Sequence, residues 1–277
     1  MIKEVQKKSK HTSINTNKRN LSIQFSLDGF SFCITNLETN EIIHFSEYVF
    51  KNTLATPELL LEKIESIFST DIQLQQDFMA IEVIHQNNLA TLVPTKYFNE
   101  EELATYLNFN IKTLATDFIT FDEVTELDAK NVYVPYVNIN NYVFQNFGEF
   151  EYKHHSTVLI DKLLENTKNT VEKHFFVHVT KNQLDIIVVQ ENKLLFYNSF
   201  PFNTKEDFIY YILFTAEQLG LNPDDFQLTF LGDIEAASEI YKITYNYIRN
   251  IDFIKTTNSF FNAEDDFSPH SNYILVH

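Results

Sequence analysis

The chain has 277 residues, 44% of them hydrophobic, and its 38 acidic and 21 basic residues give a formal net charge of −17. An acidic surface repels phosphate backbones, and arginine occurs only at positions 19 and 249, so nucleic-acid binding is not expected. No apolar run approaches the ~20 residues of a membrane-spanning helix, and the first nineteen residues hold no apolar export signal. The lone Cys33 cannot form an internal disulfide, so we expect a cytoplasmic protein without a membrane span.

Residues 1–19 differ in charge from the rest of the chain. They contain one acid, Glu4, and six basic residues: Lys3, Lys7, Lys8, Lys10, Lys18 and Arg19. Because the segment lacks an apolar cluster that could form a core, we expect a disordered basic tail.

Three strand-like runs and a helix follow the tail. Apolar residues alternate over 21–27 and 30–34, and a third apolar run covers 42–50. Between the first two runs, Asp28-Gly29 is the dipeptide of a two-residue hairpin whose central positions need positive φ. Thr56-Pro57 then predicts a helix start, with threonine as the cap and proline at the first position.

The same order recurs in the second half of the chain. Residues 175–179, 184–189 and 194–200 are strand-like, and a helix follows from Thr204 to its end at Gly220. Phe25 and Val179 align at an offset of about 154 residues, which indicates a duplicated subdomain. The polar stretch 165–173 separates the copies, so we expect a first subdomain at 20–168 and a second at 169–277.

The segments outside these units are less regular. Residues 78–84, 90–93, 132–135 and 227–231 read as strands, whereas 256–277 fit either strand or helix. Further helices are expected after the capping residue Asn99 and from about Ser156 to 166.

Two successive units of three strands and a helix resemble the actin-like ATPase (RNase H-like) superfamily. The stretch 175–220 is similar to the pilus-assembly and secretion scaffold proteins of that superfamily. The whole chain also resembles an uncharacterised bacterial domain-of-unknown-function family. The resemblance implies an α/β fold of two duplicated RNase H-like subdomains, each starting strand-strand-strand-helix.

The phosphate-binding features of that superfamily are incomplete here. Its ATPases hold phosphates in a glycine-rich turn in each half and bind Mg²⁺ through an aspartate at the first strand's end. This chain has Asp28-Gly29 in the first turn, no glycine or acid at 180–183 in the second, and Gly232-Asp233 where the superfamily has an adenosine-binding glycine pair. A side chain at such a position obstructs close approach of the backbone to phosphate, so ATPase activity is not expected.

We therefore expect a non-catalytic scaffold or adaptor, a pseudoenzyme without cofactor or metal, that binds another protein; self-association stays open. The alternative is a nucleotide-binding protein with weak or no ATP hydrolysis. Asp28 would then hold Mg²⁺, Lys181 would offer a phosphate charge, and Gly232 would lie under the base beside Asp233. A small-molecule-binding domain without turnover is a third reading. The His154-His155 pair is interpreted as satisfied or exposed histidines and not as zinc ligands.

Overall fold

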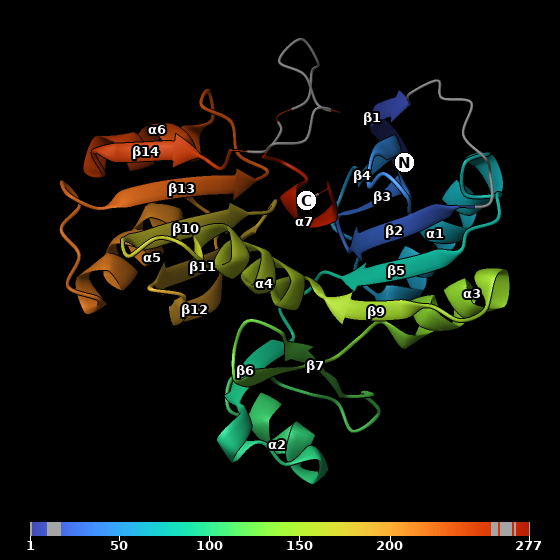
Figure 1. Ribbon diagram of the computed structural model, residues 1–277, viewed down its shortest axis with the longest axis horizontal. Coiled ribbons are helices and arrows are strands. Elements are labelled where there is room, and N and C mark those ends of the chain that lie inside the picture. Colours follow the sequence, from blue (N-terminus) through green and yellow to red (C-terminus); the bar gives the residue numbers. More distant parts are fainter. Residues whose placement is uncertain (1, 10–17, 256–259, 261–267, 269, 277) are drawn as a thin grey trace. The chain divides into compact units, whose positions relative to one another are not determined.

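The computed structural model describes residues 2–9, 18–255, 260, 268 and 270–276, and the chain divides after Leu159 into two compact units. The change of unit falls within helix α4 (His155–Thr167), ahead of the polar stretch at 165–173. Figure 1 shows a twisted sheet with helices in each unit, as expected for an α/β protein of two subdomains. No helix in the described part of the chain is long and apolar enough to cross a membrane.

The first unit is built on a six-stranded sheet in the order β1-β4-β3-β2-β5-β9. Strands β2, β3 and β4 form an antiparallel meander, and β5 and β9 run parallel to β2. Helices α1 and α3 pack on one face through their buried apolar residues. The bounds are β1 Ile2–Ser9, β2 Arg19–Ser26, β3 Gly29–Asn36, β4 Ile42–Phe50, α1 Pro57–Thr70, β5 Ala80–His85, α3 Val137–Phe147 and β9 Glu151–His154.

Strand β1 corrects the expectation of a disordered tail at residues 2–9. It pairs antiparallel with β4, from Ile2 opposite Phe50 to Ser9 opposite His44. The Lys7 ammonium lies 3.2 Å from the buried carboxylate of Asp71, and Ser9 Oγ lies 2.6 Å from His44 Nδ1. The segment is ordered because it completes an existing sheet edge and so needs no core of its own. The rest of the expected tail lies largely outside the described residues.

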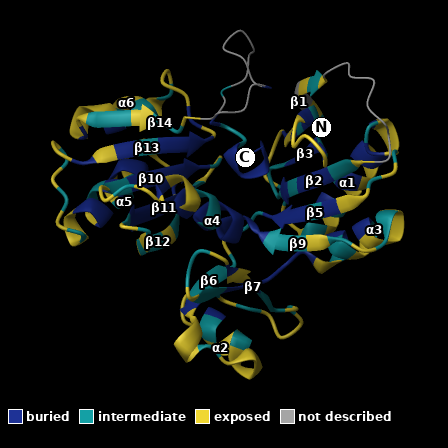
Figure 2. Ribbon diagram, in the orientation of Figure 1, coloured by how far each residue is buried: buried dark blue, intermediate teal, exposed yellow. Residues whose placement is uncertain are grey.

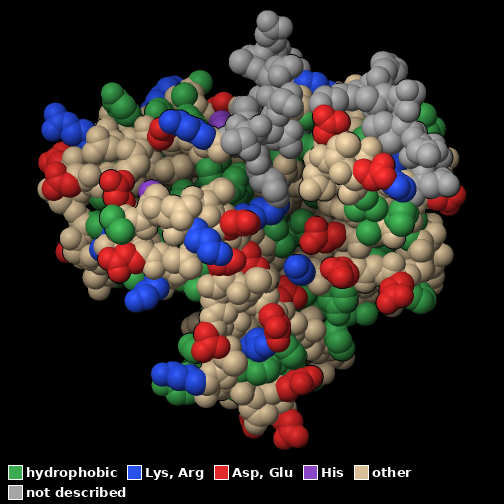
Figure 3. Space-filling model, in the orientation of Figure 1, with side chains coloured by type: hydrophobic (Ala, Val, Ile, Leu, Met, Phe, Trp, Pro, Cys, Tyr) green, Lys and Arg blue, Asp and Glu red, His purple; other side chains and the backbone are tan. Residues whose placement is uncertain are grey.

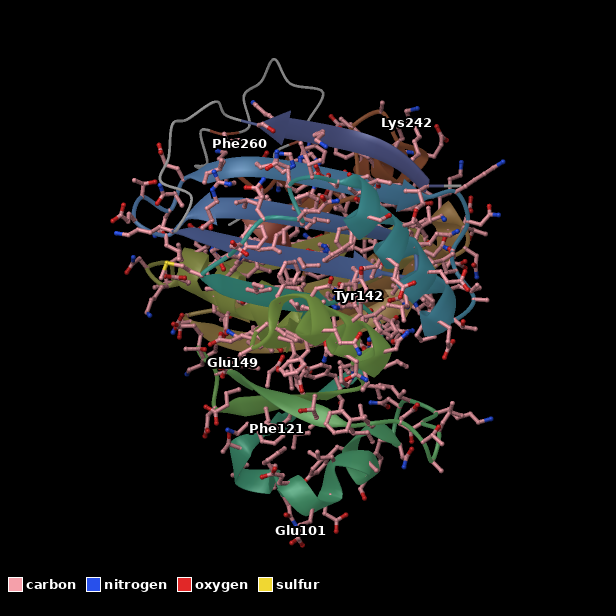
Figure 4. The ribbon with its side chains drawn as sticks, turned by 90° about the vertical axis from the view of Figure 1, so that its right-hand side faces the viewer. Glu101, Phe121, Tyr142, Glu149, Lys242 and Phe260 are labelled. Atoms are coloured by element: carbon pink, nitrogen blue, oxygen red, sulfur yellow. The ribbon has the colours of Figure 1, made fainter. Side chains whose placement is uncertain are left out.

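A small antiparallel sheet is inserted into the first unit, in the order β6-β8-β7. Its strands are β6 (Ala90–Pro94), β7 (Thr120–Val124) and β8 (Ala129–Tyr133), and the short helix α2 (Leu103–Leu107) packs against it. The expected cap at Asn99 is confirmed, since its side chain accepts the Glu101 N–H. Phe121 of β7, labelled in Figure 4, joins the apolar core that this sheet shares with α2.

The second unit has a five-stranded sheet in the order β12-β11-β10-β13-β14. As in the first unit, three antiparallel strands continue into two parallel ones. The bounds are β10 Lys173–Val179, β11 Gln183–Gln190, β12 Lys193–Pro201, α5 Lys205–Gln218, β13 Gln227–Gly232, α6 Glu239–Tyr247, β14 Asn250–Phe253 and α7 Tyr273–Val276. Helices α5 and α6 cover one face, and Figure 2 shows that the inner strands are buried.

The hairpins confirm the duplication expected from the sequence. Phe25 lies opposite Phe30 in the first hairpin, and Val179 lies opposite Leu184 in the second, so both pairs keep the offset of 154 residues. Helix α5 begins with the expected capping box, in which Thr204 and Asp207 each accept the other's backbone N–H. The two units therefore repeat both the element order and the start of the helix.

His85 ends β5 as a fully buried neutral side chain. Its Nδ1 accepts the Tyr136 N–H at 3.1 Å, so the proton lies on Nε2, which donates to Asn140 Oδ1 at 2.9 Å. Burial lowers the pKa of His85 from 6.5 to about 4, because the charged imidazolium would lose its hydration. The surrounding contacts thus fix one tautomer of the neutral ring.

This lowered pKa predicts acid sensitivity of the fold. A group with a folded pKa below its unfolded value contributes stability that is complete above pH 6.5 and is lost as the pH falls toward 4. At about 1.4 kcal/mol per pKa unit, we expect protonation of His85 to lower the free energy of unfolding by about 3 kcal/mol over this window. Urea unfolding at pH 7, 5.5 and 4 measures the loss.

The control for this experiment is His85→Gln, which keeps one acceptor and one donor but cannot be protonated. Its free energy of unfolding should fall less steeply with acid than that of the wild type. A residual slope is expected, because burial also lowers the pKa of His44 to about 4. Equal slopes in the two proteins would contradict the prediction.

Candidate functional site

The first turn lies one residue earlier in the chain than the sequence predicts. Ser26 lies opposite Gly29, so Leu27 and Asp28 form the two-residue loop and Gly29 already belongs to β3. None of these three residues has positive φ, and the interpretation of Asp28-Gly29 as the turn's central pair is wrong. Glycine is needed for a different reason, because a Cβ at position 29 would lie 2.9 Å from the Tyr48 carbonyl oxygen of β4.

Asp28 is bonded to neighbouring residues of the first unit. Its backbone N–H donates to Ser26 Oγ at 3.1 Å, and its carbonyl oxygen accepts the Phe50 N–H at 2.8 Å. The Thr53 hydroxyl donates to the carboxylate. These bonds attach the segment after β4 to the hairpin turn.

The turn of the second unit is equally short. Thr180 N–H donates to the Gln183 carbonyl at 2.9 Å, which leaves Lys181 and Asn182 as the two exposed residues of the loop. The Asn182 carbonyl accepts the Phe202 N–H at 3.0 Å, as Asp28 does for Phe50 in the first unit. Both hairpins are closed by short-range backbone contacts instead of an open glycine-rich loop.

Gly232 is the last residue of β13 and pairs with Val179 at the end of β10, and Asp233 follows directly. Gly232 has φ of +88°, and a Cβ there would lie 2.1 Å from the Val179 carbonyl oxygen, which accepts the Asp233 N–H at 2.7 Å. The Gly232 N–H donates to the carbonyl oxygen of His270 at 2.9 Å. The His270 ring is held in place because its Nε2 donates to the Ile234 carbonyl at 2.7 Å and it stacks on Phe253.

The five predicted cleft residues therefore fall into two sets. Asp28 and Gly29 lie in the first unit, whereas Lys181, Gly232 and Asp233 lie in the second. Within the second unit, the strand pairing of Val179 with Gly232 brings Gly232 and Asp233 close to the turn that carries Lys181.

A buried polar network in the first unit was not predicted from the sequence. Strands β7 and β8 supply Asp122, Asn131 and Tyr133, and the junction of β9 and α4 supplies His154, Ser156 and Thr157; all six are buried. Asp122 accepts hydrogen bonds from the Tyr133 hydroxyl at 3.0 Å, the His154 N–H at 2.8 Å and the Thr157 hydroxyl at 2.7 Å. Burial raises the pKa of this carboxyl, and the hydrogen bonds oppose that rise.

The hydrogen bonds around His154 and Asn131 each have a defined donor and acceptor. His154 Nε2 lies 3.1 Å from the Asn87 carbonyl, so this nitrogen carries the proton and Nδ1 accepts from Ser156 Oγ at 2.7 Å. Since the Ser156 and Thr157 hydroxyl protons are used, the Asn131 amide donates to both oxygens, at 2.8 and 2.9 Å. Within the described residues, Asn131 Oδ1 is buried without a hydrogen-bond partner.

This network fastens the small sheet to the start of α4. The side chains of Asn131, His154, Ser156 and Thr157 are fully enclosed, so in this conformation they do not contact a substrate. The sequence signal for the network is weak: Asp122 and Asn131 lie in two short strands of mixed composition. The residues that the structure describes contain no group of three or more His, Cys, Asp or Glu side chains arranged to hold a metal ion.

Comparisons with known proteins agree with this architecture. A crystal structure of a Bacteroides thetaiotaomicron VPI-5482 protein with actin-like ATPase fold and unknown function is similar, with a TM-score of 0.77 and 20% identity over 86% of this chain and 91% of that one. A PilM–PilN type IV pilus biogenesis complex is also similar, with a TM-score of 0.55 and 10% identity over 85% and 88% of the two chains. No curated protein matches the sequence.

The architecture is thus the actin-like ATPase fold, with two subdomains that repeat one order of elements. A family model described as "Protein of unknown function (DUF3822)" matches residues 8–251, from the end of β1 into β14. The chain therefore belongs to the DUF3822 family.

Proposed function

We propose that this chain is a non-catalytic cytoplasmic scaffold or adaptor that binds another protein through an actin-like fold. The observation that carries the proposal is the environment of Gly232. Its N–H is bonded to His270, and its Cα lies so close to Val179 that even a methyl group would clash. A glycine that makes room for the protein's own backbone leaves less room for a nucleotide at that point.

The two hairpin turns support the same proposal. Phosphate-binding loops use several backbone N–H groups that point into open space. Here two-residue loops join the strands, and the Asp28 and Thr180 N–H groups bond to Ser26 and Gln183. On the face shown in Figure 3, the lysine and arginine side chains are scattered and not gathered into a patch, which suits a protein partner better than a polyphosphate or nucleic acid.

Another protein of similar fold is known in complex with a protein partner. PilM, a protein of similar fold, has been solved in complex with PilN. That likeness is one of fold alone, so it supports binding of a protein as a general use of this architecture without naming a partner for this chain.

Calorimetric titration of the full chain with ATP plus Mg²⁺, and separately with ADP, tests the proposal. We expect no saturable heat at millimolar nucleotide. The alternative function, nucleotide binding with weak or no hydrolysis, predicts saturable heat that is lost in Asp28→Ala and in Lys181→Ala. Lys193→Ala is the matched control, because Lys193 is exposed in the same unit but begins the far strand β12. Saturable binding with that pattern would overturn the scaffold proposal.

A further inference from the structure

The two units differ at one sheet edge. Strands β4 and β12 are counterparts, since each follows the hairpin of its unit. At the end of each strand, a backbone N–H donates to the hairpin turn: Phe50 to Asp28 and Phe202 to Asn182. β4 is covered on its outer edge by β1, and six of its nine residues are buried. Among the described residues, β12 is the last strand of its sheet, and none of its nine residues is buried.

The backbone groups that β12 turns outward follow from its pairing. Because the Phe202 N–H points to Asn182, alternation along an antiparallel pair directs the N–H groups of residues 200 and 198 to β11 and that of Ser199 away from it. Ser199 N–H accordingly donates to the neighbouring Asn198 side chain at 3.0 Å. Pro201 has no N–H, and an irregularity displaces Leu195 from the ladder, so the usable edge is short and bounded at both ends.

A row of aromatic rings lies beside this edge. Phe200 of β12 stacks on Tyr211 of α5 at 4.5 Å, Tyr211 contacts Tyr210 at 5.5 Å, and Tyr210 stacks on Phe214 at 5.8 Å. Tyr210 and Phe214 are 58% and 44% exposed. An exposed aromatic row beside an open strand edge offers both backbone bonds and apolar contacts to an added strand.

Acidic side chains on α5 favour a basic occupant beside the aromatic pair, whereas the exposed Lys193 lies at the first residue of β12. Glu206 and Glu217 are exposed on α5, one before and one after the pair Tyr210 and Phe214, and the chain as a whole carries −17. The strand that already occupies the counterpart edge, β1, has three lysines and one acid. Aromatic faces also attract ammonium groups.

We propose that the outer edge of β12 binds an extended, lysine-rich segment of a protein partner that also carries apolar residues, as an added antiparallel strand. This inference rests on the proposed scaffold function and gives it a site. The partner strand would pair with the backbone of Ser199 and place apolar side chains against Tyr210 and Phe214.

The probe is a fluorescent peptide with the sequence of residues 1–10 of this chain. Its binding to the full chain is measured by fluorescence anisotropy. We expect saturable binding to the wild type and to Ser199→Ala, which keeps the outward N–H. Ser199→Pro removes that N–H without touching the bonds to β11 and should weaken binding at least tenfold. The double variant Tyr210→Ala/Phe214→Ala leaves β12 intact and should weaken binding similarly, so the test does not depend on the folding of one variant.

Two controls test the charge preference and the location of the site. A peptide with glutamate for each lysine should not bind; equal binding would overturn the charge argument. Glu47→Pro blocks the counterpart position on β4, where Gln6 of β1 pairs. Binding that is lost in Glu47→Pro and kept in Ser199→Pro would mean exchange with β1 and would overturn the site on β12.

The remaining outcomes separate this inference from the scaffold proposal. Self-association in sedimentation that Ser199→Pro abolishes would make a second copy the occupant instead of another protein. An absence of peptide binding together with an absence of nucleotide heat rejects the β12 site but leaves the scaffold proposal standing. Saturable ATP binding rejects the scaffold proposal whatever the peptide does.

Discussion

Replacement of Gly232 by alanine is expected to lower the free energy of unfolding by more than about 3 kcal/mol. Gly232 has φ of +88°, where any residue with a Cβ is strained, and the new Cβ would lie 2.1 Å from the Val179 carbonyl oxygen and 2.9 Å from the Val179 nitrogen. Both obstacles are backbone atoms of β10, so relief would require separation of β10 from β13. Urea unfolding followed by circular dichroism measures the loss.

Gly220→Ala is the matched control. Gly220 has φ of +64° and ends α5, where its N–H and that of Leu221 bond to the carbonyls of Glu217 and Ala216. No atom lies within 4 Å of a Cβ at this position, so only the left-handed strain remains, at about 1 kcal/mol. Equal losses in the two variants would show that the contact with Val179 is not the reason for Gly232.

Asp122→Ala is the second change with a large expected effect, a loss of about 3 kcal/mol in the free energy of unfolding. The carboxylate accepts three buried hydrogen bonds, and its removal leaves the donors of Tyr133, His154 and Thr157 without their acceptor. The backbone N–H of His154 has least freedom to find another partner. Chemical denaturation at pH 7 gives the value.

Glu123→Ala is the control on the same strand. The Glu123 side chain is 76% exposed and pairs with Lys130 on the surface, so its loss should change stability by less than about 1 kcal/mol. Tyr133→Phe removes one of the three donors to Asp122 and should fall between the two variants. A loss in Asp122→Ala as small as that in Glu123→Ala would mean that the network does not stabilise the fold.

The order of elements was predictable because local signals and the final fold agree. The alternating apolar residues of β2 and β3 are all buried, and Thr56 and Thr204 cap α1 and α5 as expected. Short strands with mixed composition were harder. The sequence of β7 has no clear strand pattern, and that of α3 predicts no helix, since Asn140 and the residues around it have weak helical preference.

The candidate sites were less predictable because they depend on contacts between distant residues. The sequence predicts Gly29 in a turn, but glycine is needed there because of Tyr48 on the neighbouring strand. The network of Asp122 and Asn131 joins residues up to 35 positions apart, and no short motif encodes such spacing. β1 has the composition of a tail, and only the free edge of β4 makes it a strand.

The pairing of β1 with β4 has a consequence for synthesis on the ribosome. β1 ends at Ser9 and β4 at Phe50, so about 40 residues separate the completion of the two strands. At about 5–20 residues per second, the first strand waits about 2–8 s for its partner. Its lysines suit that interval, because charged residues keep an unpaired extended segment hydrated and discourage nascent chains from pairing with one another.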